Sequence, residues 1–360
     1  MNKIKTNCLP ALIGSLPMKD HRKATELMLS CTPEIPLWVQ LPIYSEEGMM
    51  TQFLPGFPGI TIKDEKIFID TESSNFEQEF LSFFEDYLLL SETGTDISNS
   101  RFAMTTETAK GFFELINILT CKLLEKKEMP FAIKGQVTGP ITFCTSVTDQ
   151  NGRAIFYNDQ LKDAAIKHLA MKAKWQVQQF AKFNCPTFIF LDEPVLAGFG
   201  TSAFITITRK DAEDALNEII DTIHAEGGLA GIHVCANTEW PILLESSVDI
   251  ISFDAYSFFD KFILYPEQIK QFMEKGGLLA WGIVPTDNLK TIEKESVKSL
   301  LTKWNLQALQ LEKIGLTMET IMSQTMITPS CGTGSLPLNL ATKVLELTRG
   351  VADELREQLV

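Results

Sequence analysis

Short apolar segments alternate with longer amphipathic segments along almost the whole chain, and this alternation constrains the fold more than any other feature. Segments that are apolar at nearly every position are typical of strands in a parallel sheet covered by helices. Eight such units favour a closed (β/α)8 barrel, whereas about six would suit an open doubly wound sheet. The predicted strands are Pro10–Ser15, Trp38–Pro42, Phe131–Gly139, Phe188–Pro194, Gly231–Cys235, Ile250–Ala255, Leu278–Pro285 and Thr325–Cys331.

The segments between these strands have helical periodicity. Gly227-Gly228 and Gly276-Gly277 fall where helices are expected to end, directly before two of the strands. We therefore predict an α/β protein, a single (β/α)8 TIM barrel that spans residues 1–360 as one domain. The clearest predicted helices are Gln160–Phe183, Arg209–Glu226, Thr291–Glu312 and Leu338–Gln358.

The connection between the second and third predicted strands, about residues 43–130, is far too long for one crossover helix. An insertion of this size after a barrel strand usually forms part of the substrate mouth or a lid. Its predicted elements are a β-hairpin of Ile60–Ile62 and Lys66–Ile69, followed by two helices around Asn75–Leu90 and Thr105–Lys127.

The charge of the chain limits its partners. With 46 acidic and 32 basic residues, the net charge is −14 at pH 7. Such a surface repels phosphate backbones and anionic lipids, so we expect neither nucleic acid nor membrane as a partner. No apolar run reaches the roughly 20 residues of a spanning helix, and the first residues lack the apolar core of a signal peptide, so a cytoplasmic location is expected.

In a barrel, functional residues collect at the C-terminal ends of the strands. The fifth predicted strand ends with His233 and Cys235, which alternation places on the same side, about 6–7 Å apart. Cys331 ends the eighth strand, and Asp254 lies at the end of the sixth. Imidazole, thiolates and a carboxylate suit zinc, so we predict a Zn²⁺ site held by these four residues. A structural or accidental pairing is the alternative, because His-x-Cys alone is a weak signal.

Two further strand ends predict substrate contacts. Asp192 and Glu193 follow an apolar run and precede Pro194, so one carboxylate should face the barrel mouth and bind an ammonium group or transfer protons. A helix N-cap is the alternative. Gly14 and Ser15 end the first strand, where the backbone and a hydroxyl can bind a carboxylate.

Taken together, these strand ends resemble the catalytic barrel of the cobalamin-independent methionine synthase family, within the wider superfamily that includes uroporphyrinogen decarboxylase. The resemblance covers nearly the whole chain, but only the catalytic barrel of full-length family members. It implies that Ser15 contacts the substrate amino acid, that Asp192 binds the homocysteine amine, and that zinc is bound at the histidine and cysteine positions. The motifs are Ile13-Gly14-Ser15-Leu16-Pro17, Leu191-Asp192-Glu193-Pro194, His233-Val234-Cys235 and Pro329-Ser330-Cys331-Gly332.

The chain departs from the family pattern in three places. Asp254 replaces the family's zinc-binding glutamate, the seventh strand lacks the family's histidine, and the N-terminal half that helps to hold methyl-folate is absent. The family also has a substrate-binding glutamate early in the insertion. This implies a role for Glu47 in preference to Glu46, although two solvated loop acids are the alternative.

The resemblance therefore implies a zinc-dependent methyltransferase that converts homocysteine to methionine, with His233, Cys235, Cys331 and Asp192 as catalytic residues. Short barrel-only members take the methyl group from a methylated corrinoid protein, so this donor is expected here instead of methyl-folate. Another thiol such as coenzyme M is a rival acceptor, but it has no ammonium group for the acid pair to bind. Porphyrin decarboxylation is disfavoured, because no arginine lies at a strand end. A zinc-holding or corrinoid-protein-binding protein without turnover is the non-enzyme alternative.

Overall fold

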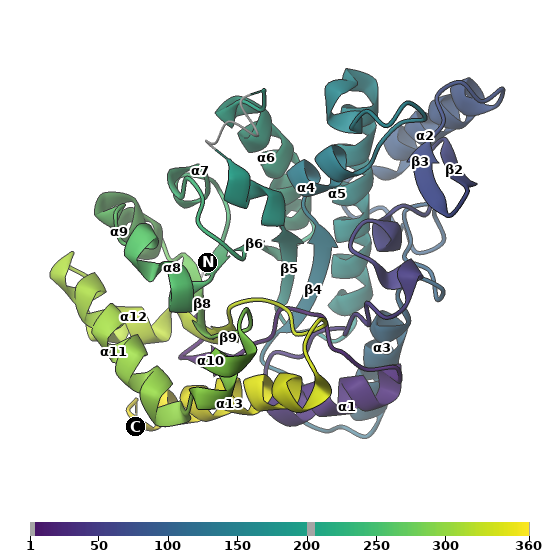
Figure 1. Ribbon diagram of the computed structural model, residues 1–360. Coiled ribbons are helices and arrows are strands. Elements are labelled where there is room, and N and C mark those ends of the chain that lie inside the picture. Colours follow the sequence, from purple (N-terminus) through teal and green to yellow (C-terminus); the bar gives the residue numbers. More distant parts are fainter. Residues whose placement is uncertain (1–3, 200–205, 360) are drawn as a thin grey trace.

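The chain folds around a parallel β-sheet that curls on itself and carries helices on its outer face (Figure 1). The computed structural model describes residues 4–199 and 206–359. Seven strands pair in the order β1-β9-β8-β7-β6-β5-β4, each parallel to its neighbours, which confirms the α/β class. The strands are β1 (Leu9–Pro10), β4 (Ile133–Thr138), β5 (Thr187–Asp192), β6 (Leu229–Val234), β7 (Ile250–Phe253), β8 (Leu278–Val284) and β9 (Thr325–Pro329).

The predicted second strand, Trp38–Pro42, is not a regular strand of this sheet. Single parallel bridges instead pair Leu37 with Lys134 of β4, and Gln40 with Ser15 beyond the end of β1. Pro36 and Pro42 border the segment and have no N–H to donate, which limits regular ladder pairing. The first predicted strand is also shorter than expected.

Helices cover the outer face of the sheet. The predicted helix Thr291–Glu312 is wrong as a single element, because α10 (Leu289–Lys294) ends before α11 (Val297–Lys313) begins. Ser296 and Ser299 form a capping box that starts α11 and so favours this break. The other helices outside the insertion are α1 (His21–Cys31), α4 (Pro140–Ser146), α5 (Asp159–Ala181), α6 (Arg209–Ala225), α7 (Pro241–Leu244), α8 (Ala255–Phe262), α9 (Pro266–Glu274), α12 (Met318–Ser323) and α13 (Leu338–Glu357).

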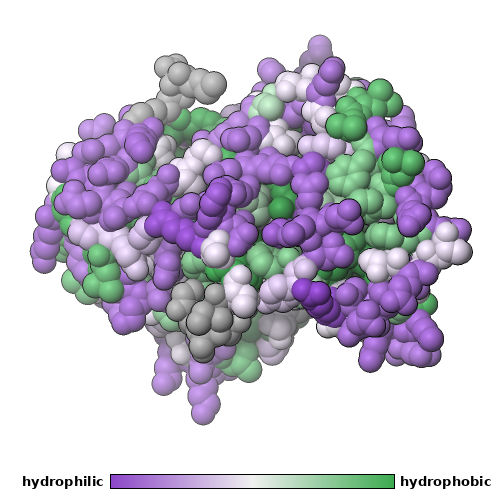
Figure 2. Space-filling view, turned by 90° about the horizontal axis from the view of Figure 1, so that it is seen from above, coloured by the Kyte–Doolittle hydropathy of each residue, from purple (hydrophilic) through white to green (hydrophobic). Residues whose placement is uncertain are grey.

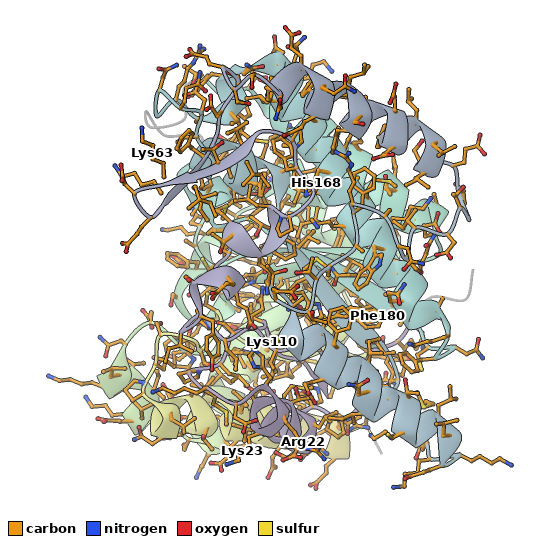
Figure 3. The ribbon with its side chains drawn as sticks, turned by 90° about the vertical axis from the view of Figure 1, so that its right-hand side faces the viewer. Arg22, Lys23, Lys63, Lys110, His168 and Phe180 are labelled. Atoms are coloured by element: carbon orange, nitrogen blue, oxygen red, sulfur yellow. The ribbon has the colours of Figure 1, made fainter. Side chains whose placement is uncertain are left out.

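The insertion has the predicted elements: the antiparallel hairpin of β2 (Ile60–Lys63) and β3 (Lys66–Ile69), then α2 (Phe76–Leu90) and α3 (Lys110–Leu124). It packs on α5, where His168 Nε2 lies 2.8 Å from the Phe53 carbonyl oxygen and Phe180 contacts Phe112 of α3. Figure 3 looks onto this side of the molecule, with both α5 residues lying under the insertion.

Two apolar cores lie on opposite faces of the sheet. The larger one fills the space between the strands and the helices. The smaller one lies on the inner face and includes Phe188 and Phe190 of β5 together with Leu278 and Ala280 of β8. Further along these strands, polar side chains such as Asp192 of β5 and His233 of β6 lie at or near the C-terminal ends.

The face that lies above the sheet in the view of Figure 1 is largely polar. Hydrophilic residues cover most of the face seen in Figure 2, and hydrophobic residues form small separate groups there. Within the described residues, the search for a helix of sufficient length and apolar character to cross a membrane found none.

Candidate metal centre and substrate pocket

Three of the four predicted zinc ligands come together in space. His233 lies in β6, Cys235 follows this strand directly, and Cys331 lies two residues beyond β9. One ligand atom from each residue lies within 4.8 Å of the other two. Strands β6 and β9 are not neighbours, since β7 and β8 separate them, and the curl of the sheet brings their ends together.

The His233 imidazole is held in the form that a metal requires. Its Nδ1 lies 2.9 Å from Ser252 Oγ on the adjacent strand β7, and its Nε2 is buried without a hydrogen-bond partner in the part of the chain that the structure describes. Burial, assisted by the charge of Lys134, lowers the His233 pKa to about 3. The ring is therefore neutral near pH 7, and its fixed orientation leaves Nε2 available as a ligand.

Cys235 and Cys331 form a hydrogen-bonded pair of thiols. The hydrogen bond from Cys331 lowers the pKa of Cys235 to about 7, against the opposing effect of burial. The bond to Cys235 and burial raise the pKa of Cys331 in turn. Loss of the first thiol proton of the pair is therefore favoured. Loss of the second is opposed by the negative charge of the first thiolate. A bound cation would relieve this repulsion, so the donor set fits a zinc ion with three protein ligands and an open fourth position.

The structure does not bring Asp254 into this group of three ligands. Asp254 directly precedes α8, and its Oδ1 accepts a hydrogen bond of 2.8 Å from Ser257 N as the N-cap of that helix. Aspartate is among the preferred N-cap residues, which accounts for this orientation. Direct ligation by Asp254 stays a prediction.

A cavity of about 320 Å³ lies over the three ligands. This volume is at the lower end of the range for small-molecule sites. Gly14 does not line this cavity; a Cβ there would lie 2.7 Å from Gln40 Oε1, so the glycine allows close packing of the wall. The predicted site residues on its wall are Ser15, Glu47, Asp192, His233, Cys235 and Cys331.

Asp192 is the last residue of β5, and its side chain belongs to the cavity wall. Its Oδ1 is buried and has no hydrogen-bond partner among the described residues. Burial raises the pKa of Asp192 to about 6, while the charge of Lys134 acts in the opposite direction. A buried carboxylate oxygen without a partner is costly, and a ligand ammonium would satisfy it.

Glu193, the second acid of the pair, is a structural cap. Its Oε1 accepts from Ile141 N at 2.8 Å, and its Oε2 accepts from Thr142 N at 2.9 Å and from Thr142 Oγ1 at 2.6 Å. Burial raises the pKa of Glu193 to about 7, although these bonds oppose the shift. Glu193 is not among the residues that line the cavity. Its side chain does not cap the short helix that follows it, and instead binds the N–H groups at the start of α4, which precedes β5 in the chain.

Two residues from other parts of the chain complete the wall. Glu47 is buried, with Oε1 2.5 Å from His21 Nε2 and Oε2 accepting from Leu41 N at 2.8 Å, whereas Glu46 is exposed. Ser15 Oγ accepts from Gly334 N at 3.1 Å. Glu47 lines the cavity and Glu46 does not, and a contact of Glu47 with substrate stays a prediction.

Sequence reasoning missed the support that surrounds these side chains. Ser252 was not recognised as the partner of His233, although it lies opposite His233 on the neighbouring strand. Lys134 was also missed, although Lys134, Gln136 and Thr138 alternate along β4 in a pattern that places polar residues on one face. Burial lowers the pKa of Lys134 to about 8, and the charge of Asp192 opposes that shift.

A comparison of the chain with protein-family models and a comparison with curated proteins each found no match. The function is therefore inferred from the residues of the chain itself.

Proposed function

We propose that the chain is a zinc-dependent methyltransferase that transfers a methyl group to the thiol of homocysteine and forms methionine. The observation that carries this proposal is the composition of one cavity wall. It combines a possible metal-binding group, His233, Cys235 and Cys331, with the unpartnered carboxylate oxygen of Asp192. An amino-acid thiol needs both features, because its sulfur must be activated and its ammonium group must be bound.

A zinc ion held at this group would lower the pKa of a thiol and so supply a thiolate nucleophile near neutral pH. The residues of the chain have separate tasks. Ser252 keeps His233 Nε2 directed away from β7, Asp192 binds the substrate ammonium group, and Ser15 with its neighbouring N–H groups binds the carboxylate. Held at both charged groups, the substrate sulfur has one orientation in the cavity. The bond from the methyl carbon to sulfur forms as its bond to the donor breaks, and the thiol proton passes to solvent.

The donor that we propose is a methylated corrinoid carried by a partner protein, as the resemblance to barrel-only family members implies. Asp192 favours homocysteine over coenzyme M as the acceptor, because a thiol sulfonate offers no ammonium group to its free oxygen. A zinc- or corrinoid-protein-binding protein without turnover remains the alternative of another class.

We also propose that the curled sheet is a closed (β/α)8 barrel and that residues 1–360 form one cytoplasmic domain. The bridges Leu37–Lys134 and Ser15–Gln40 support closure, because they join residues 37–40 to β4 on one side and to the continuation of β1 on the other.

The test is a methyl-transfer assay on zinc-loaded protein with methylcobalamin as the donor and either homocysteine or coenzyme M as the acceptor. We expect methionine formation that is lost in Cys331→Ser and retained in Cys185→Ser, a half-buried cysteine outside the candidate centre. Methylation of coenzyme M alone would support the rival acceptor. Bound zinc without methylation of either thiol would support the non-enzyme alternative.

A further inference from the structure

Lys134 is a buried cation beneath the substrate cavity, and the reaction described above does not use it. It is the second residue of β4, and its Nζ lies 4.6 Å from the ring centroid of Phe190, which belongs to the apolar core of the inner face. The ammonium group therefore lies between that core and the polar end of the sheet. Among the described residues, it forms no ion pair within 4.0 Å, and the charge of Asp192 acts on it only from a greater distance.

Stability alone does not account for a lysine in this position. Burying an ammonium group without an ion-pair partner is costly, and an apolar residue of similar volume often stabilises a core better. Lys174, by contrast, is buried with Glu226 3.1 Å away.

The strongest contact of Lys134 is with the turn that carries Ser15. Its Nζ donates a hydrogen bond of 2.6 Å to the Ile13 carbonyl oxygen, and Gln136 Oε1 accepts at 3.4 Å. Ile13 and Ser15 both line the substrate cavity. Without Lys134, the Ile13 carbonyl would lose its donor in a buried position, and the turn would be free to shift.

We propose that Lys134 is a positioning residue of the amino-acid pocket, which holds the Ile13–Ser15 turn where Ser15 can bind the substrate carboxylate. This inference rests on the proposed function, since it assigns Ser15 the carboxylate of an amino-acid thiol. It requires that loss of Lys134 weakens a thiol that bears a carboxylate more than the matching thiol without one.

The test measures binding of four thiols to zinc-loaded protein by calorimetry, so that it does not depend on turnover. Homocysteine has both charged groups, 4-mercaptobutyrate has only the carboxylate, 3-aminopropane-1-thiol has only the ammonium group, and 1-propanethiol has neither. The variant is Lys134→Met, which keeps the length of the side chain and removes its charge. The matched control is Lys172→Met, because Lys172 is an equally buried lysine on α5 whose Nζ contacts the Ala103 carbonyl oxygen of the insertion.

We expect Lys134→Met to weaken homocysteine about tenfold more than 3-aminopropane-1-thiol, and 4-mercaptobutyrate about tenfold more than 1-propanethiol. The two thiols of each pair differ only in the carboxylate, so the effect of the lost Lys134 charge on Asp192 is the same for both. Lys172→Met should leave all four unchanged. In a Ser15→Ala background the carboxylate-dependent effect of Lys134→Met should disappear, because both residues act on the same carboxylate. If Lys134→Met does not fold, Lys134→Gln provides the same comparison with a polar side chain.

Equal weakening of all four thiols, or effects that add in the double variant, would overturn the inference. Failure of the proposed function has a different signature, since the unmutated protein would then bind homocysteine no more tightly than 1-propanethiol.

Discussion

The acid pair at the end of β5 leads to a sharp prediction, because two adjacent carboxylates have opposite tasks. Glu193 accepts three hydrogen bonds and Asp192 Oδ1 accepts none among the described residues. In Glu193→Gln, an amide nitrogen replaces one acceptor. At least one buried donor then loses its partner, and the bonds that remain lose the assistance of the carboxylate charge.

A buried donor without a partner costs about 1–3 kcal/mol, and the two weakened bonds together add about 1 kcal/mol. We therefore expect Glu193→Gln to lower the free energy of unfolding by about 2–4 kcal/mol while the homocysteine affinity of the folded protein changes little. In Asp192→Asn no hydrogen bond to Oδ1 is lost and the interaction removed is that of the carboxylate charge with Lys134, so the loss of stability should be smaller than in Glu193→Gln. Homocysteine should bind about 10–100-fold more weakly, since a charge-assisted bond to the ammonium group is lost.

The assay combines urea unfolding with calorimetric titration of homocysteine for both variants. 3-Aminopropane-1-thiol should follow homocysteine in Asp192→Asn, and 4-mercaptobutyrate should not. The assignment of roles would be refuted if Asp192→Asn unfolded as readily as Glu193→Gln, or if Glu193→Gln caused the larger loss of homocysteine affinity.

Three further predictions address the metal centre, a surface pair and a helix start. Ser252→Ala should weaken zinc binding by about 10–100-fold, because Nδ1 of His233 loses its hydrogen-bond partner. Competition with a chelator measures the zinc affinity, and an unchanged value would show that Ser252 does not orient the ring. His224 lies 2.7 Å from Asp249, and this hydrogen bond raises the His224 pKa above 6.5. The stability from this pair is complete below about pH 6.5 and is lost as pH rises through the raised pKa, so urea midpoints should show this decrease and His224→Gln should remove it. The pair is partly exposed, so less than about 1 kcal/mol is expected. Ser296→Ala should cost about 1 kcal/mol in the same urea assay through loss of the capping box that starts α11, and an unchanged midpoint would contradict this.

Local patterns in the sequence were sufficient to predict the strands that carry the site. The apolar runs at Phe188–Pro194 and Thr325–Cys331 correspond to β5 and β9, and the predicted hairpin is formed by β2 and β3, joined by the turn Asp64-Glu65. These patterns hold because burial on both faces of a strand imposes apolar residues at consecutive positions. The grouping of His233, Cys235 and Cys331 could be predicted for the same reason, as all three lie at the ends of parallel strands.

Other features depend on tertiary contacts that no local pattern contains. The sequence does not distinguish which of Asp192 and Glu193 faces the cavity. In the structure, N–H groups at the start of α4, a distant part of the chain, donate to Glu193 and hold it away from the cavity. The break between α10 and α11 was missed because the helical periodicity continues across Ser296. Residues 37–40 pair with β4 and with Ser15 only through single bridges and form no regular strand, since prolines border the segment.

The central claim is that His233, Cys235 and Cys331 hold a zinc ion that can take up a thiol. X-ray absorption at the zinc edge measures this directly on purified, zinc-loaded protein before and after addition of homocysteine. We predict two sulfur neighbours at about 2.3 Å before addition and three afterwards. A sulfur count that stays at two in the presence of saturating homocysteine, or a protein that retains no zinc, would contradict the account.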